Sequence, residues 1–214
     1  YRLGPYGSLA LPALTAEQGA SGNYGRMGQQ AALAWVRDNI AAFGGDPTDV
    51  TLFGQSAGGL STCLHMIAPA SRGLFQRAIV QSGLCEMELV DLATAEADGL
   101  ALASALGCDG AGALACLRAA TPDAIEAVDA TGMTIVDELS GERTWWAIRD
   151  GAFLTQGFRE AVLAGDVMDV PTMIGWNRDE GTFFTYLADT TGETFDEATY
   201  RAVLTAIAEN QGLT

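Results

Sequence analysis

The sequence predicts an α/β fold, in which a mostly parallel β-sheet is covered by helices on both faces. Two observations support it. Strand-like and helix-like segments alternate along the chain, and one strand runs directly into a Gly-x-Ser-x-Gly turn followed by a helix. With 214 residues, 49% hydrophobic and 18% charged, the chain is long and apolar enough to bury a sizeable core. We therefore expect one domain, residues 1–214.

The strand–turn–helix segment covers residues 50–66 and holds the sequence Gly54-Gln55-Ser56-Ala57-Gly58. A serine on a sharp strand-to-helix turn, called a nucleophile elbow, has its Oγ exposed above the sheet. Gly54 and Gly58 are expected to leave room for the tight backbone. The helix that begins after Ser56 directs N–H groups and its positive dipole end toward the serine. The sequence therefore predicts Ser56 as a nucleophile and the Ala57 N–H as an oxyanion donor.

The five-residue pattern alone is a weak signal, because a chain with 26 glycines produces such patterns by composition. The alternative interpretation is a glycine-rich turn that holds a buried serine. A β-branched and apolar strand directly before the pattern and a helix directly after it favour the nucleophile elbow.

The other elements follow from periodicity and from turn residues. Residues 1–22 are predicted as a loop, and apolar spacing predicts a helix over 26–43 that Gly44-Gly45 ends. The elbow helix is expected to reach about residue 67, and residues 145–151 are poorly patterned. We predict further strands over 77–82 and 170–175, and further helices over 91–106, 113–119, 122–128, 155–163 and 196–208.

Charge and composition exclude several classes of function. The net charge is −16, from 27 acidic and 11 basic residues, which argues against nucleic acid and anionic membrane surfaces as partners. No apolar run approaches about 18 residues, so no transmembrane segment is predicted. One histidine and no Cys/His cluster cannot build a zinc site, and no metal or other cofactor is expected.

Four cysteines leave the redox compartment open. Cys108 and Cys116 enclose a short glycine-rich loop, and a bridge there would contribute about 2–3 kcal/mol through chain entropy. Two buried thiols are the equal alternative. Cys63 and Cys85 are predicted to be core cysteines.

A serine nucleophile needs a base that takes its proton and an acid that orients the base. Glu180 follows the predicted strand 170–175, where such sheets place their sites, although a solvated loop carboxylate is the alternative. The single histidine, His65, lies nine residues after Ser56 on the same predicted helix. That spacing places it about 13 Å along the helix axis. His65 is therefore interpreted as a histidine near a helix end, and the chain lacks a catalytic base.

Several motifs together resemble one family. The segments before the elbow include Gly22-Asn23-x-Gly25, the predicted helix that contains Gln29, and Phe43-Gly44-Gly45-Asp46-Pro47. They are similar to those of the type-B carboxylesterases. This is the carboxylesterase/cholinesterase family of α/β-hydrolases. The resemblance runs over nearly all of residues 1–185, and further matching segments are 1–5, 72–79, 108–118 and 170–181.

The resemblance implies site residues one by one. Ser56 would be the nucleophile, Glu180 the triad acid on the strand–loop segment 170–181, and the Ala57 N–H one of three oxyanion donors. The other two donors would come from a His-Gly-Gly-Gly loop before Tyr1, and the family histidine would follow Thr214. The chain thus resembles the middle piece of a longer α/β-hydrolase, truncated at both ends. The resemblance also implies a Cys108–Cys116 disulfide.

The implied function is hydrolysis of small-molecule carboxylic esters through an acyl-enzyme, without a cofactor, and we expect this piece alone to be inactive. The alternative is an esterase-like adhesion protein that binds partners without catalysis; such relatives typically lose the nucleophile. Two residues depart from the family pattern: Gly28 stands where Asp is usual, and Gln55 replaces a frequent Glu. An acidic chain with a disulfide favours an extracytoplasmic location. The sequence indicates neither the oligomeric state nor the ester.

Overall fold

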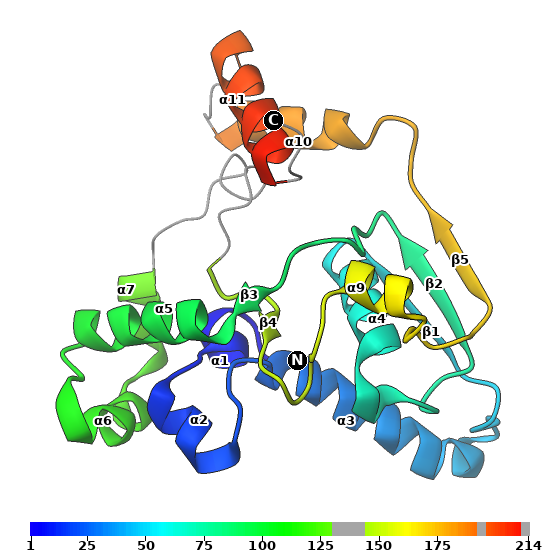
Figure 1. Ribbon diagram of the computed structural model, residues 1–214, viewed down its shortest axis with the longest axis horizontal. Coiled ribbons are helices and arrows are strands. Elements are labelled where there is room, and N and C mark those ends of the chain that lie inside the picture. Colours follow the sequence, from blue (N-terminus) through cyan, green and yellow to red (C-terminus); the bar gives the residue numbers. More distant parts are fainter. Residues whose placement is uncertain (130–143, 192–195, 211–214) are drawn as a thin grey trace. The chain divides into compact units, whose positions relative to one another are not determined.

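The computed structural model describes residues 1–129, 144–191 and 196–210 (Figure 1). It divides into two compact units. The first comprises Tyr1–Ala120 and Trp145–Trp176, and the second Thr121–Thr144 and Asn177–Thr214. The predicted elbow lies in the first unit and Glu180 lies in the second, so each is described within its own unit.

The first unit is built on a three-stranded sheet in the order β1-β2-β5. Its strands are β1 (Thr51–Gln55), β2 (Arg77–Gln81) and β5 (Thr172–Gly175), and both pairings are parallel (Figure 1). The predicted parallel α/β architecture is confirmed, and these strands lie where the sequence predicts them. Because all three strands run in the same direction, their C-terminal ends meet at one edge, directly beside Ser56.

Helices α3 (Tyr24–Asn39), α4 (Ala57–Ile67) and α9 (Phe158–Ala164) pack on the sheet face that carries Leu52 and Ala78. The strand register places Phe53, Ile79 and Met173 in one row, and side-chain alternation directs that row to the opposite face. Phe53 is 69% exposed and Met173 is 67% exposed. This second face therefore presents an apolar row within the described residues.

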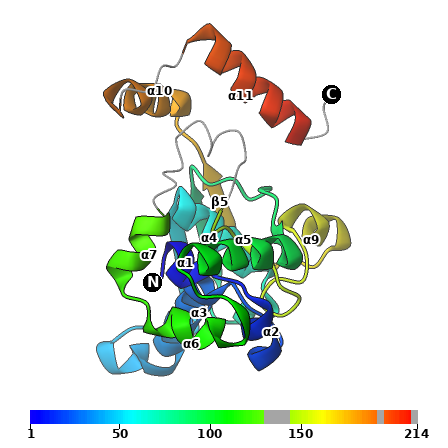
Figure 2. The ribbon, with the colours of Figure 1, turned by 90° about the vertical axis from the view of Figure 1, so that its left-hand side faces the viewer.

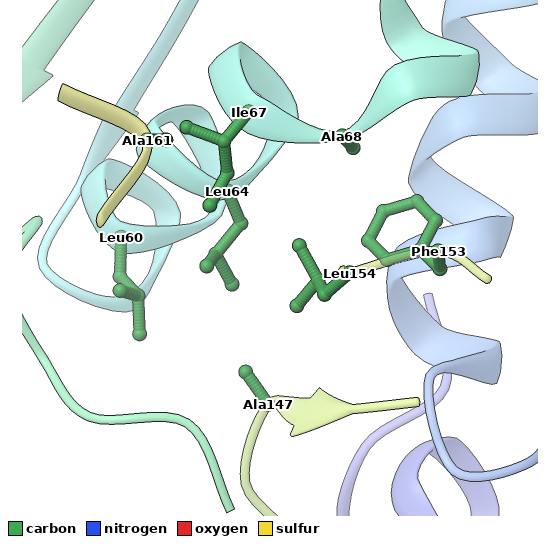
Figure 3. Packing of buried hydrophobic residues seen from close by; sticks show 8 residues of the cluster. All are labelled: Leu60, Leu64, Ile67, Ala68, Ala147, Phe153, Leu154 and Ala161. Carbon is green, nitrogen blue, oxygen red and sulfur yellow. The ribbon is translucent and has the colours of Figure 1, made fainter. Parts of the chain in front are cut away.

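Helix α4, which follows Ser56, is fixed by the largest core cluster. Every residue from Gly59 to Ile67 is buried except Ser61. Figure 3 shows Leu60, Leu64 and Ile67 of α4 facing residues from distant parts of the chain. The cluster is completed by Ala68, Ala147, Phe153, Leu154 and Ala161. Burial of these side chains holds the start of α4, and with it the turn that precedes it.

A second, two-stranded parallel sheet joins segments far apart in the sequence. It pairs β3 (Val90–Asp91) with β4 (Ile148–Arg149). Neither strand is predicted from the sequence, because two-residue strands show no periodicity. The pairing explains the poorly patterned stretch around residues 145–151: its partner strand lies more than 50 residues earlier in the chain.

The predicted loop over residues 1–22 is wrong. It contains the short helices α1 (Gly4–Ser8) and α2 (Pro12–Gln18). Both helices have a proline in the first turn, where the missing N–H costs nothing, and Gly19 ends α2 in the left-handed conformation. These prolines therefore mark helix starts within the segment that the sequence pattern predicts as a loop.

The remaining predicted helices are confirmed, the 113–119 helix with its predicted ends and the others with shifted ends; α10 (Glu180–Thr191) is not predicted from the sequence. The 26–43 helix is α3 followed by a 3-10 turn, η1 (Ile40–Phe43). Figure 2 shows α2, α5 (Leu92–Ala105) and α6 (Ala113–Ala119) together, and their apolar side chains form one cluster in the first unit. The other elements are η2 (Pro69–Ser71), α5 (Leu92–Ala105), η3 (Gly110–Gly112) and α6 (Ala113–Ala119) in the first unit, with α7 (Pro122–Asp129), α10 (Glu180–Thr191) and α11 (Glu197–Asn210) in the second.

Among the described residues, no single helix has the length and apolar character needed to cross a membrane. One bent pair, Leu92–Ala105 with Gly110–Ala119, meets that test on length and composition, with an angle of 101° between its parts.

All four cysteines form disulfides. Cys108 and Cys116 are joined, as the family resemblance implies. Cys63 and Cys85 are also joined by a disulfide, which the sequence does not predict. Cys63 lies in the core as predicted, whereas Cys85 is only partly buried. Cys63 lies on α4 and Cys85 lies beyond the end of β2, and the packing of α4 on the sheet brings them together.

Candidate active site

Ser56 lies between the last residue of β1 and the first residue of α4, with φ 54° and ψ −119°. A positive φ is rare for a residue with a side chain, and such strain is concentrated at functional sites. The turn is held by two backbone bonds: the Ser56 N–H donates to the Gln81 oxygen at 2.9 Å, and the Ser56 oxygen accepts from the Leu60 N–H at 3.0 Å. Ser56 and Ala57 are both exposed.

The glycines of the elbow have different roles. A Cβ on Gly54 would overlap the carbonyl group of Gly58, so β1 and α4 approach too closely there for any side chain. A Cβ on Gly58 itself would meet no atom within 4 Å. The expected need for a small residue is therefore supported at Gly54, whereas Gly58 contributes its backbone to the contact.

Ala57 begins an eleven-residue helix, so its N–H belongs to the first turn, whose amides have no partner within the helix. The helix dipole adds a positive partial charge at this end. Gln55 lies in register with Gln81 on the neighbouring strand, and both side chains are exposed. The position before the serine thus carries a neutral amide.

Glu180 is the first residue of α10, in the second unit. Its Oε1 accepts two hydrogen bonds from Asn177, from the backbone N–H at 2.7 Å and from the side-chain Nδ2 at 3.3 Å. In the sequence Glu180 follows the end of β5 by five residues. The carboxylate is thus held in a defined orientation on a segment that leaves the C-terminal edge of the sheet.

His65 is 2% exposed and both its ring nitrogens have partners. Nε2 lies 3.2 Å from Gln29 Oε1, and Nδ1 lies 2.9 Å from Ser71 Oγ. Burial, together with the smaller effect of the nearby Arg26 charge, lowers the pKa of His65 to about 4. Since the amide oxygen of Gln29 can only accept, Nε2 carries the proton of the neutral ring. His65 is therefore a neutral bridge between α3, α4 and η2.

The tryptophans divide between the core and the surface. Trp146 is partly buried and packs against the core cluster of α4. Trp176, directly after β5, is 59% exposed.

Among the described residues, no group of three or more His, Cys, Asp or Glu side chains is arranged to hold a metal ion.

A strand that enters a strained serine and continues into a buried helix, on a parallel sheet, is the arrangement of an α/β-hydrolase fold. Comparison with known proteins gives the family: the profile described as Carboxylesterase family matches residues 1–211. The chain belongs to the carboxylesterase family, a family of enzymes that hydrolyse carboxylic esters.

Individual relatives agree with this membership. The chain is 37% identical over 209 residues to pyrethroid hydrolase Ces2e of Rattus norvegicus, covering 95% of the chain and 34% of the relative. It is 37% identical over 183 residues to acylcarnitine hydrolase of Mus musculus, covering 84% and 30%. It is 36% identical over 192 residues to cholinesterase 1 of Branchiostoma lanceolatum, covering 86% and 53%. The chain thus spans about a third to a half of the length of these relatives.

Proposed function

We propose that this chain carries the nucleophile and the acid of a serine esterase and forms the middle part of a longer carboxylesterase. The observation that supports it most directly is the backbone of Ser56, whose φ of 54° occurs at a strand-to-helix turn that leaves the residue exposed. The surrounding contacts stabilise that conformation, and backbone strain of this kind is concentrated at functional sites.

In the proposed reaction, Ser56 Oγ attacks the carbonyl carbon of an ester while a histidine outside this chain takes its proton. The alcohol leaves with a proton from the same histidine, and water then releases the acid from the acyl-serine. Ala57 N–H helps to stabilise the oxyanion, because it belongs to the first turn of α4. Glu180 orients the histidine, and the two hydrogen bonds from Asn177 hold its carboxylate.

The apolar row Phe53–Ile79–Met173 supports the proposal that this sheet belongs to a larger domain. Phe53 and Met173 are more than two-thirds exposed, and the face they share is of the kind that helices cover in other parallel sheets. The proposed base and the two further oxyanion donors would come from the rest of that domain. Small-molecule esters are the proposed substrates.

The test is covalent labelling of the intact esterase that contains this sequence with a fluorophosphonate, in which serine Oγ displaces fluoride. We expect labelling of the peptide with Ser56, turnover of a nitrophenyl ester, and loss of both in Ser56→Ala. Ser104→Ala, which changes another exposed serine, is the matched control and should behave as the wild type. Full turnover by Ser56→Ala would overturn the proposal.

Residues 1–214 alone are proposed to be inactive, because loss of a triad member costs roughly 10⁴–10⁶-fold in rate. Ordinary turnover of a nitrophenyl ester by this piece, abolished by Ser56→Ala, would contradict that part of the proposal.

A further inference from the structure

The segment that begins with the last residue of β2, Gln81–Cys85, is attached to the elbow and to α4 at three points. We call it the post-β2 segment. Its first residue accepts the hydrogen bond from the Ser56 N–H at 2.9 Å. Its third residue, Gly83, contacts the first turn of α4, and its last residue, Cys85, is bonded to Cys63. Among the described residues, this is the disulfide that joins α4 to another segment, since the other one links Cys108 to Cys116.

The contact at Gly83 joins backbone to backbone. A Cβ on Gly83 would lie 2.9 Å from both the Cα and the carbonyl carbon of Gly59, and 3.0 Å from the Leu60 nitrogen. In the opposite direction, a Cβ on Gly59 would lie 3.1 Å from the Gly83 Cα. Both glycines are buried. The start of α4 and the post-β2 segment therefore meet without side chains between them.

The Cys63–Cys85 disulfide links the post-β2 segment to α4 two residues beyond the Gly83–Gly59 contact. Cys63 is fully buried on α4, and its Cα lies 5.4 Å from that of Cys85. Cys63 follows Ser56 by seven residues, which is about two helical turns, so both lie on the same side of the helix. The post-β2 segment thus runs along the side of α4 that begins at the nucleophile.

The same segment also contacts the strand that leads to Glu180. The N–H of Ser82 donates to the oxygen of Gly175, the last residue of β5, at 2.8 Å. Ser82 has a φ of 50°, so like Ser56 it has a positive φ, which is unusual for a residue with a side chain. Two strained residues therefore lie side by side at the C-terminal edge of the sheet, linked through Gln81.

We propose that the post-β2 segment, fastened by the Cys63–Cys85 disulfide, is a positioning element for the nucleophile. This inference rests on the proposed function of Ser56. A strained backbone conformation persists only where its surroundings fix it, and the three attachments fix the elbow on the side of β2. The disulfide acts through the backbone of Ser56 and does not touch the substrate.

The second disulfide of the same chain supplies a matched control. In the intact esterase we compare Cys63→Ala/Cys85→Ala with Cys108→Ala/Cys116→Ala. Both pairs should lower the melting temperature, because both remove a cross-link. Only the first should lower kcat, by about 10- to 100-fold, with KM changed by less than about threefold, because it displaces the nucleophile. Equal effects on kcat from the two pairs, or no effect from the first, would overturn the proposal.

A second variant tests the segment without breaking a covalent bond. Gly83→Ala should lower kcat in the same way, since its Cβ would push the segment away from α4. Gly28→Ala is its control, because a Cβ there meets no atom within 4 Å. A Gly83→Ala enzyme with the kcat of Gly28→Ala would count against the proposal.

Hydrogen–deuterium exchange separates this inference from the proposed function. The Ser56 amide, bonded to Gln81, should exchange faster in Cys63→Ala/Cys85→Ala and at the wild-type rate in the control pair. If the wild-type protein hydrolyses no ester, the proposed function is wrong. Faster exchange of the Ser56 amide in Cys63→Ala/Cys85→Ala would still show that the disulfide holds the Ser56 backbone in place. Unchanged exchange at Ser56 refutes the positioning role whatever the activity.

Discussion

The side-chain amide of Asn23 pairs with the backbone of Ile148 in both directions. Its Nδ2 donates to the Ile148 oxygen at 2.7 Å, and its Oδ1 accepts from the Ile148 N–H at 3.2 Å. Asn23 is 1% exposed and precedes α3, yet its side chain does not cap that helix. The amide therefore makes the two hydrogen bonds with β4 that the backbone of a neighbouring strand would make. It links the start of α3 to a residue 125 positions later in the chain.

Replacing Asn23 by alanine should lower the free energy of unfolding by about 2–4 kcal/mol, because a buried N–H and a buried C=O lose their partners. Asn39→Ala is the control, since Asn39 is only partly buried and its side chain donates within its own helix, to the Trp35 oxygen. We expect that control to change stability by less than about 0.5 kcal/mol. Urea unfolding of both variants measures the difference, and equal midpoints would contradict the role of Asn23.

Two glycines four residues apart in the elbow should respond differently to alanine. Gly54→Ala should destabilise the protein by about 1–3 kcal/mol or more, because its Cβ has to displace the Gly58 carbonyl. Gly58→Ala should keep or raise stability, since its Cβ meets nothing within 4 Å and alanine favours a helix by about 1 kcal/mol. Thermal unfolding decides between these expectations. A larger loss at Gly58 than at Gly54 would show that the elbow backbone is arranged differently.

The sequence predicts the elements that are encoded locally. The elbow strand and helix follow from β-branched residues, a glycine-bounded serine and a long apolar segment, all within residues 50–67. Helix α7 follows from Thr121 and Pro122, and Thr121 Oγ1 accepts from the Ala124 N–H at 3.3 Å as a cap. In each case the determining residues lie within one or two turns of the element.

What the sequence does not predict depends on contacts between distant residues. Strand β4 is fixed by Asn23, and Cys63 meets Cys85 only because α4 packs beside the end of β2. The partners of His65 come from two other elements, Gln29 of α3 and Ser71 of η2. Spacing excludes His65 as the base, but no local pattern names its partners. The roles of Ser56 and Glu180 stay predictions.

The neutral residue beside the nucleophile should affect charge selectivity. Gln55 is exposed and directly precedes Ser56, and the family resemblance gives many members a Glu there. In the intact esterase, Gln55→Glu should raise kcat/KM for a cationic choline ester relative to a neutral ester of the same acyl group. One carboxylate near the cation contributes about 1 kcal/mol, or roughly fivefold. A ratio that does not change with this substitution would place Gln55 outside the substrate site.

His65 should make stability depend on pH. Burial, with the Arg26 charge, lowers its pKa in the folded protein to about 4, whereas an unfolded chain has the ordinary value of about 6.5. Between these values the unfolded state binds a proton that the folded state does not, so the free energy of unfolding falls as the pH falls. The loss should be about 2 kcal/mol at pH 5 and about 3 kcal/mol at pH 4.

Exposed carboxylates also lose stabilising bonds in acid, so the contribution of His65 needs a difference measurement. Hydrogen bonds and ion pairs lower the pKa of Glu17, Asp38 and Glu160, and these groups remain in every variant. His65→Gln keeps an amide donor toward Gln29 and removes the titrating ring. Urea unfolding from pH 7 to pH 4 should therefore give a smaller slope for His65→Gln than for the wild type. Equal slopes for the two proteins would contradict this prediction. They would mean that His65 has the same pKa in the folded and the unfolded protein, so that the folded ring is protonated below about pH 6 while it keeps its bond to the Gln29 oxygen.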